Sequence, residues 1–266
     1  MSPLLNLLFQ TTGNKFAQQV LLKIADYAQY LMGIGSGTHA ESSGEKGVFD
    51  LLRQKSQTPY CVFDVGANTG QYLHLVLSNF HKDSVHIHCF EPGKLTFAAL
   101  TGNTPDNASI KLNNIALGKQ KGEAQLYYDE KKSGLASLTK RRLDHFQINF
   151  EESEVITLDT LDNYCNNNNI NKINLLKIDV EGHELDVLAG AIGMLRKRAI
   201  DIVTFEFGGC NIDTRSFFQD FYYFFEDVGM RISRITPSGY LYPIGSYTEI
   251  LEQFRTTNFV ATRPAS

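Results

Sequence analysis

The residues best placed to do chemistry follow a short apolar run near residue 60. Tyr60–Phe63 is continuously apolar, which is typical of a strand buried on both faces, and residues 64–70 (DVGANTG) then turn the chain. Gly66 and Gly70 would let the backbone come close to a ligand where a side chain would block it. Apolar residues at helical spacing follow over Tyr72–Phe80. A strand, a glycine turn and a helix in this order predict the nucleotide pocket of a doubly wound sheet.

Four predicted strands end in an acidic residue, namely Asp64, Glu91, Asp179 and Glu206. Each residue alone is explained equally well as a helix cap or a solvated charge. The carboxyl ends of parallel strands meet at one edge of a sheet, however, and ligands bind there. The four carboxylates together predict an acidic pocket suited to a cationic or polyhydroxylated ligand.

The spacing of Glu91 and the glycines narrows the choice of ligand. Glu91 lies about 25 residues after Gly66, close to the ~20-residue spacing at which a carboxylate accepts hydrogen bonds from ribose hydroxyls. The turn reads G-x-N-x-G, so Asn68 stands where a pyrophosphate loop needs a second glycine, and Asp64 would repel phosphates. S-adenosylmethionine, which carries a ribose and cationic sulfonium and ammonium groups, fits this pocket better than a nicotinamide dinucleotide. A nicotinamide-dependent oxidoreductase is the enzyme alternative.

Three segments together resemble a known family: residues 63–70 (FDVGANTG), 90–92 (FEP) and 176–184 (LKIDVEGHE). The chain from about Glu45 to Arg263 is similar to the FkbM family of S-adenosylmethionine-dependent methyltransferases. The resemblance implies an α/β, class I methyltransferase (Rossmann-like) fold, a three-layer sandwich with a mostly parallel seven-stranded sheet. It also implies O-methylation of sugar hydroxyls, commonly in surface polysaccharide, glycolipid or secondary-metabolite pathways. A non-catalytic scaffold that keeps the fold within a glycan-assembly complex is the alternative from another functional class.

The resemblance also assigns roles to individual residues. The loop at residues 133–137 (SGLAS) resembles a small-residue loop near the cofactor. The implied cofactor contacts are Asp64, Gly66, Asn68 and Gly70 on the methionine side, Glu91 at the ribose, Asn114 and Ala116 beside the adenine at the third strand, and Asp179 at the rim. The implied catalytic residues are Asp179, Glu181 and His183, facing the methyl group.

His183 is the expected general base, because an unperturbed histidine pKa of ~6.5 suits proton removal near neutrality. Asp179 or Glu181 would orient its ring; the alternative is that His183 only begins the next helix. A second hypothesis places Mg²⁺ or Mn²⁺ between Asp179, Glu206 and His183. The spacing of these residues does not favour a metal, so we expect none.

Composition limits the class of protein and its partners. The 266 residues are 42% hydrophobic and 20% charged with a net charge of −4, which describes a globular domain without a general attraction for nucleic acid. No run approaches the ~18 apolar residues of a membrane span, and no signal peptide is evident. Buried thiols in a reducing cytoplasm are expected for the cysteines, which show no C-x-x-C spacing: Cys61, Cys89, Cys165 and Cys210.

We expect a helical extension over residues 1–44, ending in a Gly/Ser-rich stretch, and a methyltransferase domain over residues 45–266. An amphipathic stripe between Ala17 and Leu31 predicts packing of the extension against the domain, with a homo-oligomer or membrane contact as the alternative. Residues 129–154 form a polar, basic segment. Its Lys140, Arg141 and Arg142 are interpreted as a solvated face, or else as contacts for a phosphate or carboxylate of a glycan acceptor.

Overall fold

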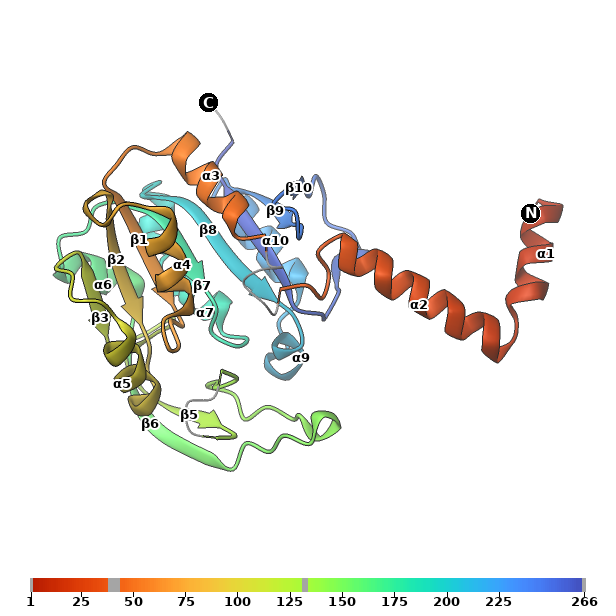
Figure 1. Cartoon of the computed structure of the whole chain (residues 1–266), viewed down its shortest axis with the longest axis horizontal. Coiled ribbons are helices and arrows are strands. Elements are labelled where there is room, and N and C mark those ends of the chain that lie inside the picture. Colours follow the sequence, from red (N-terminus) through yellow and green to blue (C-terminus); the bar gives the residue numbers. More distant parts are fainter. Residues whose placement is uncertain (1, 38–43, 131–133, 265–266) are drawn as a thin grey trace.

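The computed structural model describes residues 2–37, 44–130 and 134–264. Its centre is an eight-stranded sheet in the order β10-β9-β11-β8-β7-β1-β2-β3 (Figure 1). The strands from β8 to β3 in this order are parallel, and β11 is antiparallel to both of its neighbours. The strands are β1 (Tyr60–Val65), β2 (Val85–Phe90), β3 (Ile110–Asn113), β7 (Ile173–Ile178), β8 (Ile200–Phe207), β9 (Arg231–Ile235), β10 (Leu241–Pro243) and β11 (Thr257–Thr262).

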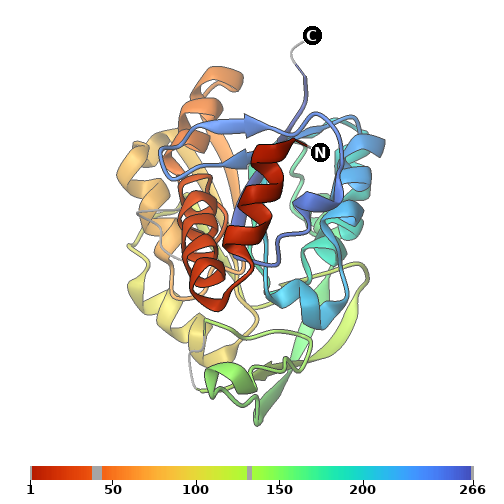
Figure 2. The same cartoon turned by 90° about the vertical axis from the view of Figure 1, so that its right-hand side faces the viewer.

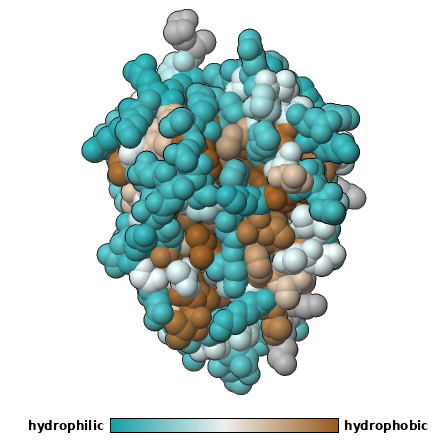
Figure 3. Space-filling model, turned by 90° about the vertical axis from the view of Figure 1, so that its left-hand side faces the viewer, coloured by the Kyte–Doolittle hydropathy of each residue, from teal (hydrophilic) through white to brown (hydrophobic). Residues whose placement is uncertain are grey.

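Helices cover both faces of this sheet, which confirms the α/β fold with a mostly parallel sheet. One face packs on α3 (Lys46–Lys55), α4 (Gln71–Asn79) and α5 (Lys94–Asn103). The other face packs on four helices: α6 (Leu161–Asn167), α7 (Glu184–Gly190), α8 (Ile192–Arg196) and α10 (Phe218–Asp227). Figure 3, which views the molecule from the β3 edge, shows apolar and hydrophilic groups intermixed on that surface.

Strand β1 shows why its sequence is apolar without alternation. Phe63 and Val65 belong to the core on one face of the sheet, and Tyr60 and Val62 belong to the core on the other. Both faces are therefore buried, as a central parallel strand requires. The first βα unit places the turn after β1 at the carboxyl edge of the sheet.

Two expectations about strands need correction. The sheet has eight strands rather than seven, because the turn after β9 returns the chain as a short edge strand, β10. The third strand, at which Asn114 and Ala116 were expected, is also divided: β3 ends at Asn113, and β4 (Ala116–Leu117) joins a separate three-stranded sheet. The Asn114 amide donates to the carbonyl oxygens of Glu91 and Pro92, at 2.9 and 3.0 Å, and this turns the chain between the two strands.

The second sheet carries the polar segment toward the carboxyl edge of the main sheet. It consists of β4, β6 (Glu152–Asp159) and β5 (Gly122–Tyr128), in that order. The chain between β5 and β6 runs below the carboxyl ends of the central strands and beside α9 (Cys210–Thr214) (Figure 1).

The N-terminal helices differ from the expectation that they pack on the domain. Helices α1 (Pro3–Thr12) and α2 (Lys15–Leu31) project from the side of β9 and β10 (Figures 1 and 2). No residue of α2 is buried, and its Phe16 and Leu22 are 76% and 68% exposed. The helical spacing of the apolar residues correctly predicted that α2 is a helix, but the expectation that it packs on the domain was wrong. None of the helices in the described ranges combines the length and apolar character needed to cross a bilayer.

This exposure leads to a stability prediction. We expect Leu22→Gln to change the free energy of unfolding by no more than ~0.5 kcal/mol, because the side chain lacks tertiary packing. Leu52→Ala in α3, where Leu52 is fully buried, is the matched control and should cost ~2–5 kcal/mol. Thermal and urea unfolding measure both. If Leu22→Gln lowers the free energy of unfolding as much as the control does, α2 is not exposed in solution and another molecule covers it.

Candidate functional site

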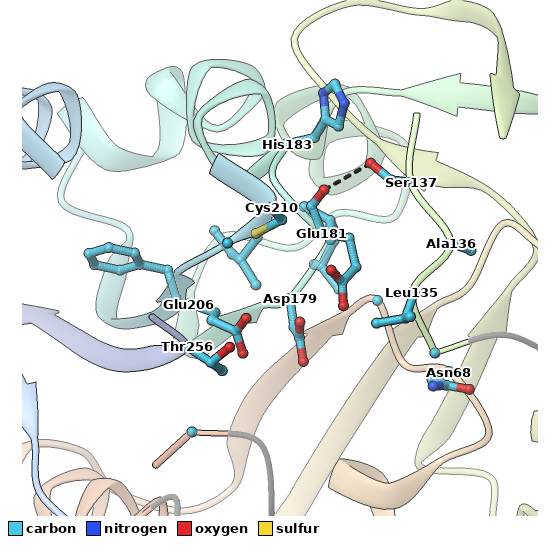
Figure 4. A pocket seen from close by; sticks show the side chains of 18 of the residues that line it. Asn68, Leu135, Ala136, Ser137, Asp179, Glu181, His183, Glu206, Cys210 and Thr256 are labelled. Carbon is cyan, nitrogen blue, oxygen red and sulfur yellow. Dashed lines mark hydrogen bonds between the residues drawn. The ribbon is translucent and has the colours of Figure 1, made fainter. Parts of the chain in front are cut away.

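A cavity of about 1150 Å³ lies at the carboxyl ends of the central strands (Figure 4). Its walls come from the turns after β1, β2, β7 and β8, and the side opposite the sheet is closed by residues 134–148. The volume exceeds the ~300–1,000 Å³ usual for a single small-molecule pocket, so the cavity has room for two ligands at once. Of the predicted site residues, those that line it are Gly66, Asn68, Glu91, Ala116, Asp179, Glu181 and His183.

The turn after β1 forms the first wall. Gly66 has φ +85°, and a Cβ at this position would lie 1.7 Å from the carbonyl oxygen of Asp179, so only glycine fits. The next residues aim polar groups at the cavity. Asn68 donates its N–H to Glu91 at 3.0 Å, and its buried Oδ1 has no hydrogen-bond partner among the described residues. An acceptor atom in this state fits a ligand that supplies a donor.

Glu91 lies at the end of β2 and is only 7% exposed. Its carboxylate accepts hydrogen bonds from the N–H groups of Asn68 and Gly93 at 3.0 and 2.9 Å, which orient it at the cavity wall. Burial raises the pKa of Glu91 to about 7, although these two hydrogen bonds oppose the shift. A carboxylate oxygen accepts more than one hydrogen bond, so the group retains capacity for a ligand hydroxyl.

The raised pKa predicts a pH dependence of stability. The Glu91 pKa is about 7 in the folded chain against 4.5 without burial, so its contribution to stability is present below pH 4.5 and is lost as the pH rises through 7. The loss should reach about 3 kcal/mol. Burial also raises the pKa values of Glu181 and Glu184, to about 8 and 7, so the chain should retain part of this slope when Glu91 is changed. We therefore expect Glu91→Gln to flatten, but not abolish, the fall in unfolding free energy between pH 5 and 8. Equal slopes for the two proteins would contradict a buried, protonated Glu91.

Asp64 does not line the cavity, which differs from its expected place at the rim. It is fully buried in β1 and pairs with Lys177 of the neighbouring strand β7, whose Nζ lies 3.3 Å from the Asp64 carboxylate and 3.2 Å from that of Asp179. Burial raises the pKa of Asp64, and Lys177 partly opposes this. Burial alone would lower the pKa of Lys177, but Asp179 and Asp64 together raise it above its usual value, so the ammonium stays charged. Lys177 also lies under the Tyr72 ring.

Lys177 is thus a site residue that the sequence reasoning missed. It lines the cavity floor with its charge and ties two of the predicted acidic residues together. The signal was present as a lysine inside the apolar strand at residues 173–178, because a buried charge needs a partner. The identity of the partner depends on strand register, which pairs Asp64 with Lys177.

The turn after β7 forms the second wall. Glu181 and Gly182 both have positive φ, at +53° and +101°, and Glu184 fixes the turn by accepting from the N–H groups of Val180 and Gly182 at 3.1 Å each. A non-glycine residue with positive φ is uncommon and often marks a functional turn. The turn directs the Glu181 side chain into the cavity, where Figure 4 shows it near Asp179.

Carboxylates crowd this side of the cavity. Glu206, at the end of β8, points into the same space as Asp179 (Figure 4), and burial together with the charges of Asp179 and Glu181 raises the Glu206 pKa well above its usual value. Arg141 forms a short ion pair with Glu181 and contacts Asp213 at 3.4 Å. Its side chain is 8% exposed, so Arg141 is not part of a solvated face as expected. Among the described residues, no cluster of His, Cys, Asp and Glu has a metal-binding arrangement.

His183 reaches the cavity wall, but its ring is oriented by a different carboxylate than expected. Nδ1 lies 2.8 Å from Asp186, one helical turn into α7, rather than against Asp179 or Glu181. Nε2 lies 3.0 Å from the Thr139 hydroxyl. Hydrogen bonding from His183 lowers the pKa of Asp186. Because the ionised Asp186 can only accept a hydrogen bond, Nδ1 carries the proton in the neutral ring and Nε2 keeps the lone pair.

Of the remaining predicted residues, Gly70 and Asn114 lie outside the cavity wall, and the small-residue loop forms part of it. Gly70 caps α4 with φ +101° and, like Asn114, lies outside the cavity wall, so their contact with a cofactor stays a prediction. In the small-residue loop, residues 134–137 line the cavity, while Ser133 lies outside the described residues. Ser137 fixes this loop by donating to the Glu181 carbonyl oxygen at 2.8 Å and by pairing with Tyr127 of β5.

These residues fit the adenosyl ligand that the sequence predicts. Glu91 offers a buried carboxylate for ribose hydroxyls, Asn68 offers an unpaired acceptor, and the turn at Gly66 leaves no side chain in the way. The side chains of Asp179 and Glu206 point into the same part of the cavity (Figure 4), which makes it the place for the cationic end of such a ligand. A positive charge there would be stabilised by Asp179 and would favour the ionised form of Glu206, which burial otherwise disfavours.

Comparisons with known proteins point the same way. Residues 64–232 match the family model described as "Methyltransferase FkbM domain". "Hexuronic acid methyltransferase AglP" from Haloferax volcanii is 27% identical over 165 residues, which cover 62% of this chain and 64% of that protein. The chain therefore spans less than two thirds of this relative.

Solved structures of low sequence identity also resemble the chain. A methyltransferase FkbM from Methylobacillus flagellatus KT has a TM-score of 0.45 and 14% identity, and the match covers 77% of this chain and 44% of that one. A putative rRNA-methylase from Clostridium thermocellum has a TM-score of 0.46 and 9% identity, with 86% and 99% covered. The family assignment rests on the match over residues 64–232, which is more than half of the chain.

Proposed function

The chain belongs to the FkbM family of methyltransferases, and from this premise we propose that it transfers a methyl group from S-adenosylmethionine to a sugar hydroxyl. The sugar acceptor is supported by the similarity to a hexuronic acid methyltransferase. The observation that carries the proposal is structural. The two motif turns within the matched segment, at Gly66–Asn68 and Asp179–His183, line the same cavity and touch each other through Gly66 and the Asp179 carbonyl.

The proposal gives the donor and the acceptor separate parts of the cavity. Glu91 and Asn68 would hold the adenosyl ribose, and Asp179 and Glu206 would face the cationic end. When bound, S-adenosylmethionine supplies a methyl group already activated by the positive charge on sulfur. The loop closing the cavity leaves the remaining space, next to Glu181 and His183, for the acceptor.

Magnitudes indicate which task matters most for these residues. Holding two reactants in line supplies up to ~7–11 kcal/mol, whereas a general base contributes ~10²–10⁴-fold, or about 3–5 kcal/mol. Positioning by the cavity walls therefore outweighs proton removal. The structure of the site fits this order, because fixed turns, hydrogen-bonded carboxylates and buried ion pairs make up most of the cavity wall described above.

His183 is the proposed base for the acceptor hydroxyl. Asp186 holds Nδ1–H and would stabilise the imidazolium, and Nε2 would take the proton after the Thr139 hydroxyl yields its place. This assignment differs from a His183 that merely begins α7, because a cap alone would not need either side-chain partner.

The base role predicts a specific kinetic defect. We expect His183→Ala to lower the turnover number at least about tenfold while the affinity for S-adenosylhomocysteine stays unchanged, since the ring lies away from Glu91 and Asn68. Asp186→Asn should give a smaller fall, because the ring loses its orientation but not its nitrogen. Transfer of labelled methyl groups to saturating glycan acceptor measures this. Full turnover by His183→Ala would exclude the base role.

The function itself is tested with glycans from a strain that lacks this gene. Mass spectrometry should show that one methyl group is missing from a sugar residue, and the purified protein with S-adenosylmethionine should restore it. Glycans identical to those of the parent strain, together with no methyl transfer in vitro, would contradict the proposal.

A further inference from the structure

The inner half of the cavity is explained by the donor, but a loop on its outer side is not. Arg141–Ile148, here called the acceptor loop, contributes six cavity-lining residues: Arg141, Arg142, Leu143, His145, Phe146 and Ile148. We propose that the acceptor loop binds a uronic acid unit, an anionic pyranose, with Arg142 contacting the sugar carboxylate and Phe146 packing on the sugar ring. This inference rests on the proposed methyl transfer to a sugar and names the class of that sugar.

The acceptor loop has a defined shape although it contains only one short helix. Leu143 is 5% exposed and pairs with Ile148 as an antiparallel bridge, and the 3₁₀ turn Asp144–Phe146 lies between them. Asp213 of α9 fixes the start of the loop by accepting from Arg141 Nε and the Arg142 N–H, at 3.4 and 3.3 Å. The loop thus holds its exposed side chains in place before a ligand arrives, which lowers the entropy cost of binding.

Only one of the two adjacent arginines is suited to a ligand. Arg141 is buried, and its charge is balanced by Glu181 and Asp213. Arg142 is 86% exposed on its side chain, and its Nε donates to Asp144 at 2.8 Å. A guanidinium carries five N–H donors in a planar fork that matches a carboxylate, so the Arg142 side chain can meet a second carboxylate beside Asp144.

The neighbouring aromatic side chain suits a sugar ring. Phe146 is 66% exposed while lining the cavity, and its ring lies 4.2 Å from that of His145, centroid to centroid. An exposed aromatic residue on a fixed loop marks a contact surface, because leaving it in water has no structural benefit. The axial C–H groups make one face of a pyranose apolar, and this face can cover the Phe146 ring.

The charge distribution favours a single carboxylate over a phosphate-rich ligand. The inner walls carry Glu91, Asp179, Glu181 and Glu206, and burial raises the pKa of Glu91, Glu181 and Glu206. These acidic groups offer hydrogen bonds to neutral hydroxyls rather than counter-charges for a polyanion. Arg141 is buried between Glu181 and Asp213, whereas Arg142 is exposed and pairs with Asp144 through Nε, so its terminal N–H groups are the cationic donors that face a ligand at the outer side. A sugar with one carboxylate places its anion beside Arg142 and its neutral hydroxyls toward the acidic interior.

The test uses methyl β-D-glucuronoside and methyl β-D-glucoside, which differ in the carboxylate. Saturation-transfer NMR titrations of the full chain, with and without S-adenosylhomocysteine, give both affinities. We expect the wild-type protein to bind the glucuronoside at least about fivefold more tightly than the glucoside. Arg142→Gln should bring this ratio to about one, and Arg142→Lys should keep part of it. Phe146→Ala should weaken both sugars by the same factor.

Lys140→Gln is the matched control, because Lys140 is exposed, lies two residues before Arg142 and is outside the cavity wall. It removes the same charge and should leave the ratio unchanged. Equal binding of both sugars by the wild-type protein, no binding of either, or a ratio that survives Arg142→Gln would each overturn the proposal. A thermal shift with S-adenosylhomocysteine separates the two levels of the argument. If S-adenosylhomocysteine raises the melting temperature but the sugars do not bind as predicted, only the acceptor loop proposal is contradicted. If S-adenosylhomocysteine gives no shift, the proposed methyl transfer is contradicted as well.

Discussion

Replacing Gly66 with alanine is expected to destabilise the chain by at least about 4 kcal/mol and to abolish binding of S-adenosylhomocysteine. The new Cβ would lie 1.7 Å from the Asp179 carbonyl oxygen and 2.8 Å from its carbon, both of them backbone atoms. The φ of +85° adds strain for any residue with a Cβ. To relieve the overlap, the turns after β1 and β7 must separate, and these two turns form the inner walls of the cavity.

Gly102→Ala is the matched control for this prediction. Gly102 lies in α5, and a Cβ there would meet no atom within 4 Å, so alanine should be neutral or stabilise by up to ~1 kcal/mol. Urea unfolding gives both free energies, and isothermal titration gives the ligand affinity. A Gly66→Ala protein that matches Gly102→Ala in stability and binds the ligand would contradict the packing of the two turns.

Replacing Lys177 with methionine is the second change for which we expect a large effect. It leaves Asp64 fully buried without its cation, and breaking a buried pair by removing one partner costs about 3–5 kcal/mol. The deficit should shrink at acidic pH. Without Lys177 the already raised pKa of Asp64 rises further, so protonated Asp64 favours the folded chain at low pH, and this contribution is lost as the pH rises through the folded pKa.

A double-mutant cycle separates the ion pair from the loss of packing. Asp64→Asn together with Lys177→Met removes both charges, so the double variant should be more stable than Lys177→Met alone. Unfolding free energies at pH 5 and pH 8 provide the measurement. If Lys177→Met costs the same in the wild-type chain and in the Asp64→Asn variant at both pH values, the pair does not hold these strands together.

The elements that form the site were predictable where one local pattern decides the structure. The apolar run of β1, the glycine turn at Gly66 and the strand that leads into Glu91 are each encoded within a few consecutive residues. The aromatic residues of α10 follow the same rule: they recur at helical spacing and pack in the core, where Phe221 stacks on Phe205 of β8 at 4.8 Å. In the strands and the helix, the spacing of the hydrophobic residues alone sets which faces are buried.

The position of Asp64 was not predictable in the same way. A strand that ends in an acidic residue suggests a rim carboxylate, but Asp64 comes one residue before the end of β1 and its side chain lies inside the sheet layers. Its burial depends on Lys177, which lies more than one hundred residues away in sequence and beside it only through the register of β1 and β7. No local pattern specifies that pairing.

The acceptor side of the cavity escaped prediction for a related reason. Residues 134–154 show no sustained period, so their charges resembled a solvated face. The burial of Arg141 depends on Asp213 of α9, and the ring of His183 depends on Thr139, both contacts between distant segments. The outward position of α2 also depends on tertiary neighbours, because an amphipathic stripe indicates a covered face without naming what covers it.

A crystal structure with S-adenosylhomocysteine tests the central claim most directly, namely that the cavity between the turns after β1, β2 and β7 holds an adenosyl donor. The ligand should lie in this cavity with both ribose hydroxyls within hydrogen-bond distance of the Glu91 carboxylate and with its methionine end toward Asp179. A cavity that stays empty at saturating ligand, or a ribose bound away from Glu91, would contradict the account.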